Sequence, residues 1–373
     1  MGEYSEVFVG MDVSKSRIAV ALAEGGRTGE TRFLGEIEAS AGAVEKLVRR
    51  LSAKHEEARF CYEAGPTGYG VQRLIDKLGH ECIVVAPSLT PRKPGDRVKT
   101  NRRDALSLAR LLRAGELTAV WVPDDRHEAM RDLTRARAEA AADLRVKRQQ
   151  TGAFLLRLGR LYPRKKTWGG AHKTWLASQA FEHLEQRIAF AEMLVAMGEA
   201  EARMVRLEKA IAEAVCDWSL APMVVALMAM RGFDLVAAST LLAEIGDLSR
   251  FRSPRELMAF LGLVPSEAST GDQVHRGRIT KAGNGRARKV MIESAWCYRH
   301  PARIGPAKLK RVEAAPPAVR QIAWKAQTRL AARYRALIKR GKSKNVAIVA
   351  IARELCGFVW AIHRALCAER AAD

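Results

Sequence analysis

The sequence predicts an α/β domain followed by two helical regions. Residues 1–125 alternate short apolar strand patterns with helical periods. Residues 126–217 carry no strand pattern, and residues 218–373 are helical with short breaks rich in Gly and Pro. At 373 residues the chain exceeds one ordinary domain of about 150 residues, so two or three domains are expected.

Three consecutive strands and a helix open the first domain. They are expected at VFVGMDVS, RIAVALAE, ETRFLGEIEA and AGAVEKLVRRLSAK. The next elements are expected, in order, as the strand ARFCYEA, the helix GVQRLIDKLG, the strand ECIVVAP, the helix DALSLARLLRAG and the strand LTAVWVPD. Three strands followed by alternating helices and strands is the order of an RNase H-like fold. A doubly wound nucleotide-binding sheet is the alternative, but no Gly-rich phosphate loop follows the first strand.

Two long helices are expected within residues 126–217, on either side of the stretch YPRKKTWGG. Apolar residues recur at helical spacing in both of them. They are Met130, Leu133, Ala140, Leu144, Phe154 and Leu158 in the first, and Leu184, Ile188, Ala191, Leu194, Met197, Met204, Leu207 and Ile211 in the second. Such stripes indicate either helix packing within one chain or an intermolecular coiled coil, and both interpretations stay open.

A helix, a tight turn and a second helix are expected at LMAMRGFDLVAASTLLAEIGD, in the region 218–373. The pattern resembles a helix-hairpin-helix, whose turn amides can meet a nucleic-acid phosphate. Asp234 stands where a second glycine usually lies, which weakens that contact. A Gly-rich, basic loop with hydroxyl side chains follows at FLGLVPSEASTGDQVHRGRITKAGNGRARK, and basic helices complete the region.

Charge is the strongest global signal. The chain has 63 Lys and Arg against 41 Asp and Glu, which gives a net charge of +22. Residues 251–373 hold 25 Lys and Arg against 8 Asp and Glu, a net of +17. Because the surplus is concentrated in one third of the chain, we expect a nucleic-acid partner there rather than a uniformly basic surface.

The N-terminus MGEYSEVFVG lacks a basic region followed by an apolar stretch, and no 18-residue apolar run is apparent. We therefore expect a cytoplasmic protein without a membrane span. The six cysteines show no CxxC or Cys/His spacing, which argues against zinc and against a disulfide framework. We expect small core residues at Cys61, Cys82, Cys216, Cys297, Cys356 and Cys367.

Three acidic residues lie at the edges of the predicted sheet. Asp12 ends the first strand, Glu63 follows the strand ARFCY, and Asp104 opens the helix DALSLARLL. Carboxylates there can converge on Mg²⁺, and two ions about 4 Å apart would assist phosphodiester cleavage. The alternatives are local hydrogen bonds for Asp12, a surface ion pair for Glu63 and a helix N-cap for Asp104.

Five ordered stretches resemble a known family. They are FVGMDVSKSRIAVAL, CYEAGPTGYG, VKTNRRDALSLARLL, LLAEIGDLSRFRSPRELMAFLGLVPSEASTG and GRITKAGNGRARK. With these motifs in this order, the chain is similar to DEDD transposases of the insertion-sequence 110 group, which include Piv-like recombinases. The resemblance spans nearly the whole chain. It implies a RuvC-like domain with four metal-binding acids, a C-terminal domain with a serine nucleophile, and DNA recombination guided by a structured noncoding RNA.

Carried over by position, the resemblance places three of the four acids on Asp12, Glu63 and Asp104. The position of the third acid holds Asn101, whose amide oxygen can ligate Mg²⁺ without contributing charge. The nucleophile's position, directly before the loop glycine, holds Thr270, and Ser269 precedes it. Either hydroxyl could attack a phosphodiester. Ser269 is slightly preferred because its primary hydroxyl is less hindered.

Two basic clusters flank these candidate sites, and their side chains could neutralise backbone phosphates. They comprise Arg97, Lys99, Arg102 and Arg103 before Asp104, and Arg276, Arg278, Lys281, Arg286, Arg288 and Lys289 after the hydroxyl loop.

Together these features predict a DNA transposase or site-specific recombinase with a RuvC-like domain at 1–125, a helical spacer at 126–217 and a basic C-terminal domain at 218–373. The expected partners are Mg²⁺, donor and target DNA, a guide RNA and further copies of the chain, as a dimer or tetramer. A RuvC-like nuclease would need the acids but no hydroxyl nucleophile. A non-catalytic nucleic-acid-binding protein is the third interpretation.

Overall fold

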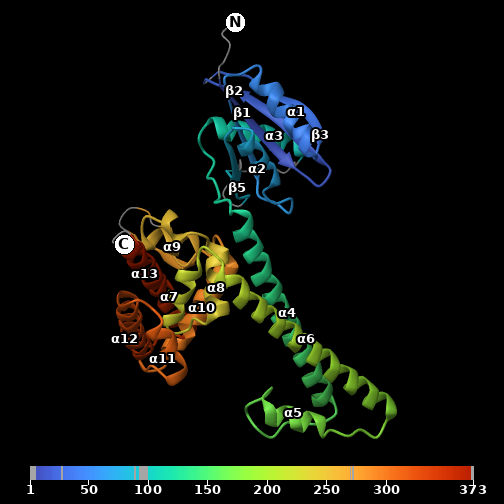
Figure 1. Ribbon diagram of the computed structural model, residues 1–373, viewed down its shortest axis with the longest axis vertical. Coiled ribbons are helices and arrows are strands. Elements are labelled where there is room, and N and C mark those ends of the chain that lie inside the picture. Colours follow the sequence, from blue (N-terminus) through green and yellow to red (C-terminus); the bar gives the residue numbers. More distant parts are fainter. Residues whose placement is uncertain are drawn as a thin grey trace. The chain divides into compact units, whose positions relative to one another are not determined.

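The computed structural model describes residues 6–26, 28–87, 90–91, 100–268, 270 and 273–370, the last without its side chain. The chain divides into two compact units, Met1–Val122 and Pro123–Asp373, each described by itself (Figure 1). The first is α/β and the second almost entirely helical.

The first unit is built on a five-stranded sheet with the order β3-β2-β1-β4-β5. Its first three strands, β1 (Glu6–Val13), β2 (Arg17–Glu24) and β3 (Thr31–Glu38), pair antiparallel, whereas β4 (Glu57–Glu63) and β5 (Cys82–Val85) extend the sheet in parallel from β1. This mixed α/β architecture agrees with an RNase H-like fold.

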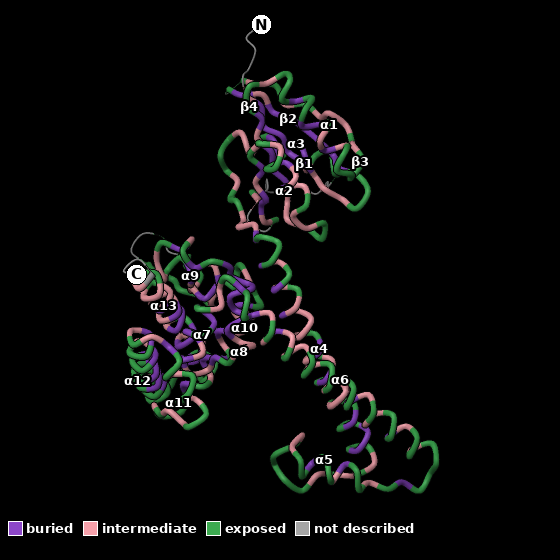
Figure 2. Tube along the Cα trace, in the orientation of Figure 1, coloured by how far each residue is buried: buried purple, intermediate pink, exposed green. Residues whose placement is uncertain are grey.

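Helices cover both faces of the sheet. α1 (Ala41–Ser52) and α2 (Gly70–Lys77) pack on one face, where they share a core with Val7, Val9 and Met11 of β1. On the opposite face α3 (Asn101–Arg113) packs its small residues Ala105 and Ala109 against Phe8 of β1 and the alanines of β2. The neighbouring strands β1 and β2 are buried on both sides (Figure 2), which explains why their sequences are apolar runs.

Two details of this unit differ from the sequence prediction. The strand expected at LTAVWVPD is reduced to a single bridge between Ala119 and Val85. Only the Val120 amide, which donates to Val84 O at 2.7 Å, extends the pairing. In addition, α3 begins three residues before Asp104, with Thr100 as its N-cap, so the N-cap interpretation of Asp104 is wrong.

In the second unit two 33-residue helices, α4 (Asp125–Arg157) and α6 (Leu184–Cys216), pack side by side as a hairpin. The short α5 (Gly170–Ala177) lies at its far end (Figure 1), over a core that includes Leu144, Phe154 and Phe190. Part of the predicted apolar stripe is therefore buried within the chain. Leu184, Ile188 and Ala191 of α6 are instead exposed.

The remaining helices enclose one large core. They are α7 (Ala221–Ala229), α8 (Leu235–Ile245), α9 (Pro254–Phe260), α10 (Gly285–Trp296), α11 (Pro306–Glu313), α12 (Pro317–Lys339) and α13 (Lys344–Arg370), with the short 3-10 helices η1 (Leu248–Arg250) and η2 (Cys297–Arg299). A hairpin of β6 (Pro265–Glu267) and β7 (Arg276–Ile279) connects α9 to α10.

Among the described residues one helix, the segment Lys344–Glu369 of α13, is long and apolar enough to cross a membrane by length and composition. The sequence analysis did not anticipate it. α13 packs against α12, α10 and α9, and Ile351, Leu355 and Val359 are completely buried in the common core. Burial in a core therefore accounts for its apolar composition.

The cysteines fall into two groups. Cys61, Cys82 and Cys356 are buried free thiols, as expected of small core residues. The prediction is wrong for the other three, which are exposed free thiols at Cys216, Cys297 and Cys367.

Candidate catalytic sites in the two units

Asp12 and Glu63 occupy adjacent positions on neighbouring strands. The parallel register of β1 and β4 pairs Gly10 with Cys61 and Met11 with Tyr62, and Asp12 and Glu63 are the residues that follow this last pair on the two strands. Neighbouring strands lie about 4.8 Å apart, and paired residues point to the same face. Both residues are half-buried at the end of the sheet.

The shared face of the two carboxylates is the one that α3 covers. Cys61, two residues before Glu63, donates its thiol to Leu108 O of α3 at 3.6 Å. Tyr62 packs in the core on the opposite face, and its hydroxyl donates to Gly68 O at 3.1 Å. Burial raises the pKa of the Cys61 thiol, and the negative charge of Glu63 raises it further.

Gly10 allows α3 to lie directly on β1. A Cβ atom at Gly10 would stand 2.4 Å from both Ala105 O and Ala109 N, so any other residue would push the helix away. Phe8, two residues earlier on the same face, lines a small cavity with Leu112 near the end of α3. The helix therefore runs antiparallel to β1, and its N-terminus lies toward Asp12.

The first turn of α3 carries the other two candidate ligands. The Thr100 hydroxyl accepts a hydrogen bond from Arg103 N at 3.3 Å, which caps the helix. Asn101 is the first helical residue and is exposed, and Asp104 is half-buried one turn later. Residues three apart share a helix face, so the Asn101 and Asp104 side chains project together.

These residues form a set of hard oxygen donors at one end of the sheet, which is the chemistry that a divalent cation requires. In the part of the chain that the structure describes, no three His, Cys, Asp or Glu side chains are close enough together to hold a metal ion. The backbone thus brings Asp12, Glu63 and the first turn of α3 to one end of the sheet, without a preformed cluster of three carboxylates.

Thr270 of the hydroxyl loop lies between β6 and β7 in the second unit. The Thr270 and Gln273 backbones exchange hydrogen bonds of 3.1 and 3.2 Å, and Ala268 N donates to His275 O at 2.9 Å. Thr270 is exposed in this turn. Ser269 and the loop glycine Gly271 lie outside the described residues.

Comparison with known proteins assigns both segments to one family. Residues 9–159, which include all four positions of the first candidate site, match the model of the DEDD transposase domain of IS110 type, described as a transposase. Residues 225–307, which include the β6–β7 hairpin, match the family described as "Transposase IS116/IS110/IS902 family".

Full-length relatives agree. The chain is 58% identical over 364 residues to a putative transposase, y4qE, of Sinorhizobium fredii, covering 98% of this chain and 90% of that protein. It is 30% identical over 335 residues to the transposase for insertion sequence element IS1533 of Leptospira borgpetersenii, covering 89% of this chain and 96% of that protein. The chain belongs to the IS110 transposase family. It is therefore an enzyme that acts on DNA.

The basic residues before Asp104 in this transposase have different surroundings. The Arg102 guanidinium lies 5.5 Å from the centre of the Phe33 ring on β3, so it stacks on the sheet. Arg103 is exposed in the first turn of α3. Arg97 and Lys99 lie outside the described residues.

The basic residues after the hydroxyl loop are exposed, with one exception. Arg288 donates to Leu261 O at 3.0 Å and to Ala282 O at 3.1 Å, so it fastens two loops of the transposase together. Gly262 makes this approach possible, because a Cβ there would meet Ala282 O at 2.2 Å. The exposed ones are Arg276, Arg278, Lys281, Arg286 and Lys289. Three of them form surface ion pairs: Arg276 with Glu267 at 3.5 Å, Arg286 with Glu139 at 3.9 Å, and Lys289 with Glu293 at 3.7 Å.

Side chains of the same chain form hydrogen bonds with the turn between α7 and α8. Asp234 caps α8 by accepting from Ala237 N at 2.7 Å, so a carboxylate stands where a helix-hairpin-helix would present amides to a phosphate. Gly232 packs on α10, where a Cβ would meet Ser294 O at 2.5 Å. Lys308 donates to Met228 O and Phe233 O, and burial lowers its pKa to about 8.

Sequence analysis missed a buried polar network that joins α4, α8 and α10. The fully buried Glu244 carboxylate accepts two hydrogen bonds from Arg135, at 2.7 and 2.9 Å, and one from Asn284 Nδ2 at 2.7 Å. Burial alone would raise the pKa of Glu244, but these hydrogen bonds lower it below its usual value. Asn284 also caps α10, the basic helix after the hydroxyl loop. A lone Glu inside the apolar stretch LLAEIG was the available signal.

Proposed function

We propose that this IS110-family transposase cuts and joins DNA through the hydroxyl of Ser269 or Thr270, assisted by Mg²⁺ at the carboxylate end of the sheet. The observation that supports this most is that Asp12 and Glu63 directly follow the paired residues Met11 and Tyr62 on neighbouring strands, at the end of the sheet where α3 begins.

Asp12, Glu63 and Asp104 would hold the metal ion, with the Asn101 amide oxygen as a neutral fourth donor. When bound, Mg²⁺ stabilises negative charge on the reacting phosphoryl oxygens. Asn101 contributes no charge, so the three carboxylates carry the electrostatic attraction to the metal. These residues lie on one face and at one end of the sheet, which supports the assignment.

The hydroxyl of Ser269 or Thr270 would attack a DNA phosphate. The serine or threonine oxygen forms a bond to phosphorus and releases its proton, while the bond from phosphorus to a deoxyribose oxygen breaks and that oxygen takes up a proton. The product is a protein–DNA phosphodiester that a second DNA end can resolve. Exposure of Thr270 at a hairpin tip supports this role, because a nucleophile must reach a bulky duplex.

The exposed cations of the two flanking clusters would hold the phosphate backbone next to these groups. A structured guide RNA, which the family resemblance implies, would use the same kind of contact on the basic C-terminal region.

We further propose that the transposase self-associates through α6. An unbroken stripe of exposed residues runs along this helix at alternating spacings of four and three, which is the spacing of a coiled-coil seam. Its large members Leu184, Ile188, Val195 and Val205 are each more than half exposed. Ala191, Gly198 and Ala202 complete the stripe. The occupant of this face would be α6 of a second copy.

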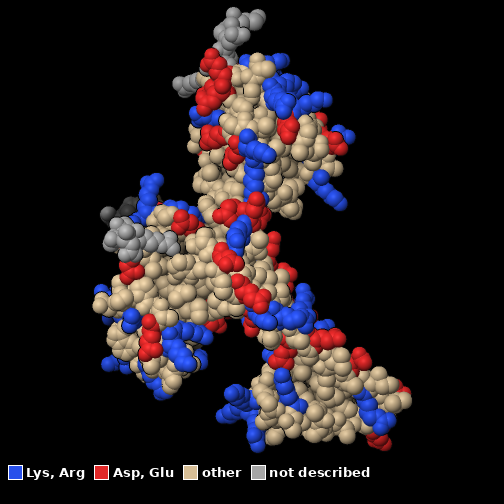
Figure 3. All heavy atoms as spheres, in the orientation of Figure 1, with Lys and Arg blue, Asp and Glu red and all other residues tan. Residues whose placement is uncertain are grey.

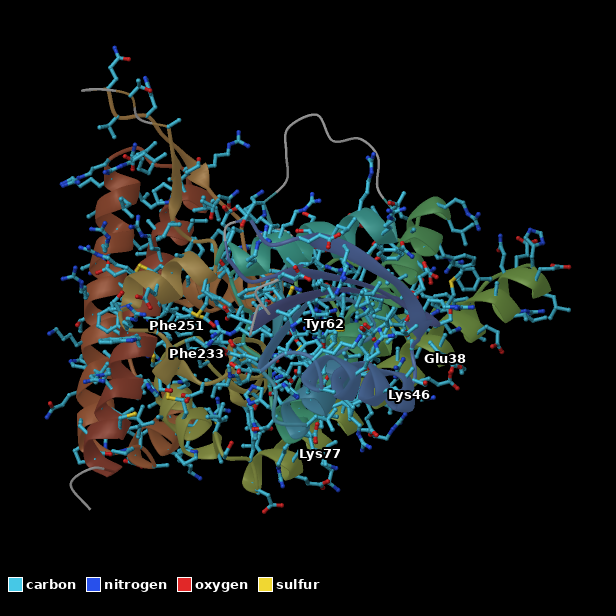
Figure 4. All side chains as sticks on the ribbon, turned by 90° about the horizontal axis from the view of Figure 1, so that it is seen from above. Glu38, Lys46, Tyr62, Lys77, Phe233 and Phe251 are labelled. Carbon is cyan, nitrogen blue, oxygen red and sulfur yellow. The ribbon has the colours of Figure 1, made fainter. Side chains whose placement is uncertain are left out.

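The metal assignment is tested by the variants Asp12→Ala and Glu63→Ala. Each removes one anionic ligand, so recombination of the native element is expected to fall at least 100-fold while the thermal unfolding temperature stays near that of the wild type. Glu38→Ala is the matched control, because Glu38 is an exposed carboxylate at the end of β3 (Figure 4) and should tolerate the change. Full activity of either site variant would exclude its carboxylate from the metal site.

A further inference from the structure

The far end of the α4–α6 hairpin carries positive charge without any acidic residue. Residues 144–181 contain nine Lys and Arg and no Asp or Glu. Figure 3 shows Lys and Arg side chains gathered beside α5 at this end of the hairpin. The nine are Arg145, Lys147, Arg148, Arg157, Arg160, Arg164, Lys165, Lys166 and Lys173. None of them belongs to the basic clusters next to the candidate catalytic sites.

A packed aromatic cluster supports the basic loop between α4 and α5. The His172 ring lies 4.5 Å from Tyr162, 4.7 Å from Trp168 and 5.6 Å from Trp175, measured between ring centroids. Trp168 takes a positive φ of 65°, and its backbone N–H donates to His172 Nδ1 at 3.1 Å. Burial lowers the pKa of His172, so the ring stays neutral and keeps this acceptor. The loop is therefore fixed at both ends.

The charges at this end are only partly neutralised within the chain. Glu201 of α6 pairs with Lys173 at 2.7 Å and with Arg148 at 3.4 Å. Arg164, Lys165 and Lys166 are all exposed, and none of the three forms an ion pair with a described residue. Three adjacent cations on a supported loop thus face solvent without a counter-charge.

We propose that this basic end of the hairpin, the loop Arg164–Lys166 with its neighbours, docks onto the phosphate backbone of duplex DNA. Complementary charge identifies a polyanion. The aromatic rings pack on one another, so they do not form a free platform on which unpaired bases could stack. Lys and Arg on a loop neutralise phosphates without reading base sequence. The inference rests on the proposed function in that the DNA held here is the DNA that the hydroxyl attacks. It adds a phosphate contact at the α5 end of the α4–α6 hairpin, outside the β6–β7 hairpin.

The test compares two full-length triple variants with equal loss of charge. Arg164→Gln/Lys165→Gln/Lys166→Gln removes the loop cations, and Lys46→Gln/Arg49→Gln/Arg50→Gln removes three exposed cations from α1, on the sheet face opposite the carboxylates (Figure 4 labels Lys46). The association constant K for duplex DNA is measured between about 50 and 300 mM salt, because its salt dependence reports the number of phosphate contacts. A third variant, Arg164→Lys/Lys165→Arg/Lys166→Arg, preserves the charge.

If all three loop cations contact phosphates, the slope of log K against log salt becomes less negative by about 2.7, and affinity falls about 500-fold near 0.1 M salt. The α1 variant and the charge-preserving variant are expected to bind like the wild type. Equal weakening by the loop and α1 variants would overturn the inference, because net charge alone would then explain it. Weakened binding to an RNA duplex with unchanged DNA binding would also overturn it. The proposed function fails separately, if the wild-type chain binds duplex DNA through the loop cations but cleaves it without forming a covalent protein–DNA linkage.

Discussion

At the scale of single residues, Glu244 shows how a buried charge can join helices that are distant in sequence. Its carboxylate receives Arg135 from α4 and Asn284 from the start of α10. Close by, the Arg131 guanidinium donates to Ala243 O at 3.0 Å at the end of α8. Cations at a helix C-terminus also interact favourably with its dipole. These hydrogen bonds thereby connect the α4–α6 hairpin to the helices on either side of the hydroxyl loop within the second unit.

Removing Arg135 should therefore destabilise the protein. Arg135→Ala leaves a buried carboxylate without its main partner, which typically costs about 3–5 kcal/mol. Arg126→Ala is the matched control on the same helix, because Arg126 pairs with Asp217 at 3.9 Å on the exposed surface and such pairs contribute up to about 1 kcal/mol. Urea unfolding of the second unit, followed by circular dichroism, measures both. Equal shifts of the two midpoints would show that the buried network adds nothing.

The pH dependence of this stabilisation has a defined sign. The folded pKa of Glu244 lies below its ordinary value of 4.5, so the unfolded chain binds the proton more readily. The contribution is fully present above pH 4.5 and is lost as the pH falls through the folded pKa. The difference in urea-unfolding midpoint between the wild type and Arg135→Ala should therefore become smaller as the pH is lowered below 4.5.

At the scale of elements, α6 presents one apolar face to α4 and a second to solvent. Met197 and Ile211 are buried within the chain, whereas the stripe through Ile188 and Val195 is exposed. The two interpretations of the apolar pattern, packing within the chain and pairing between chains, thus concern different faces of the same helix.

Polar substitution of the exposed stripe should weaken self-association. Ile188→Ser/Val195→Ser removes two large side chains from each copy of the seam, and burial of each contributes about 1.5–3 kcal/mol, so the dissociation constant should rise at least tenfold. The control Arg187→Ser/Arg203→Ser introduces the same residues on the same helix outside the stripe. Sedimentation equilibrium measures the change. Equal association of both variants and the wild type would exclude α6 as the seam.

Strand and helix patterns predicted most elements because they depend on local periodicity. The five strands of the sheet and the two long helices have clear apolar periods. The stretch LTAVWVPD has the same pattern but makes only one bridge to the edge strand β5, and an apolar run cannot reveal whether a neighbouring strand is free to pair along its length.

At the scale of the whole molecule, sequence could name the candidate carboxylates but not their arrangement. The placement of Asp12 and Glu63 at the same end of the sheet depends on parallel register between β1 and β4, and the approach of α3 depends on the missing side chain at Gly10. Both are properties of tertiary packing. The Glu244 network likewise requires three helices to meet. The family resemblance supplied the candidate roles, and the fold supplies the shared face on which the first unit's residues lie.

The central claim, attack by a hairpin hydroxyl, is tested most directly by trapping the protein–DNA linkage. Wild-type protein is incubated with its DNA and Mg²⁺, stopped in denaturant and examined for a covalent adduct, alongside Ser269→Ala and Thr270→Ala. We expect an adduct with the wild type, none with the variant that lacks the nucleophile, and a residual amount with the other. DNA cleavage by the wild type without an adduct under any condition would make water the attacking group and contradict the claim.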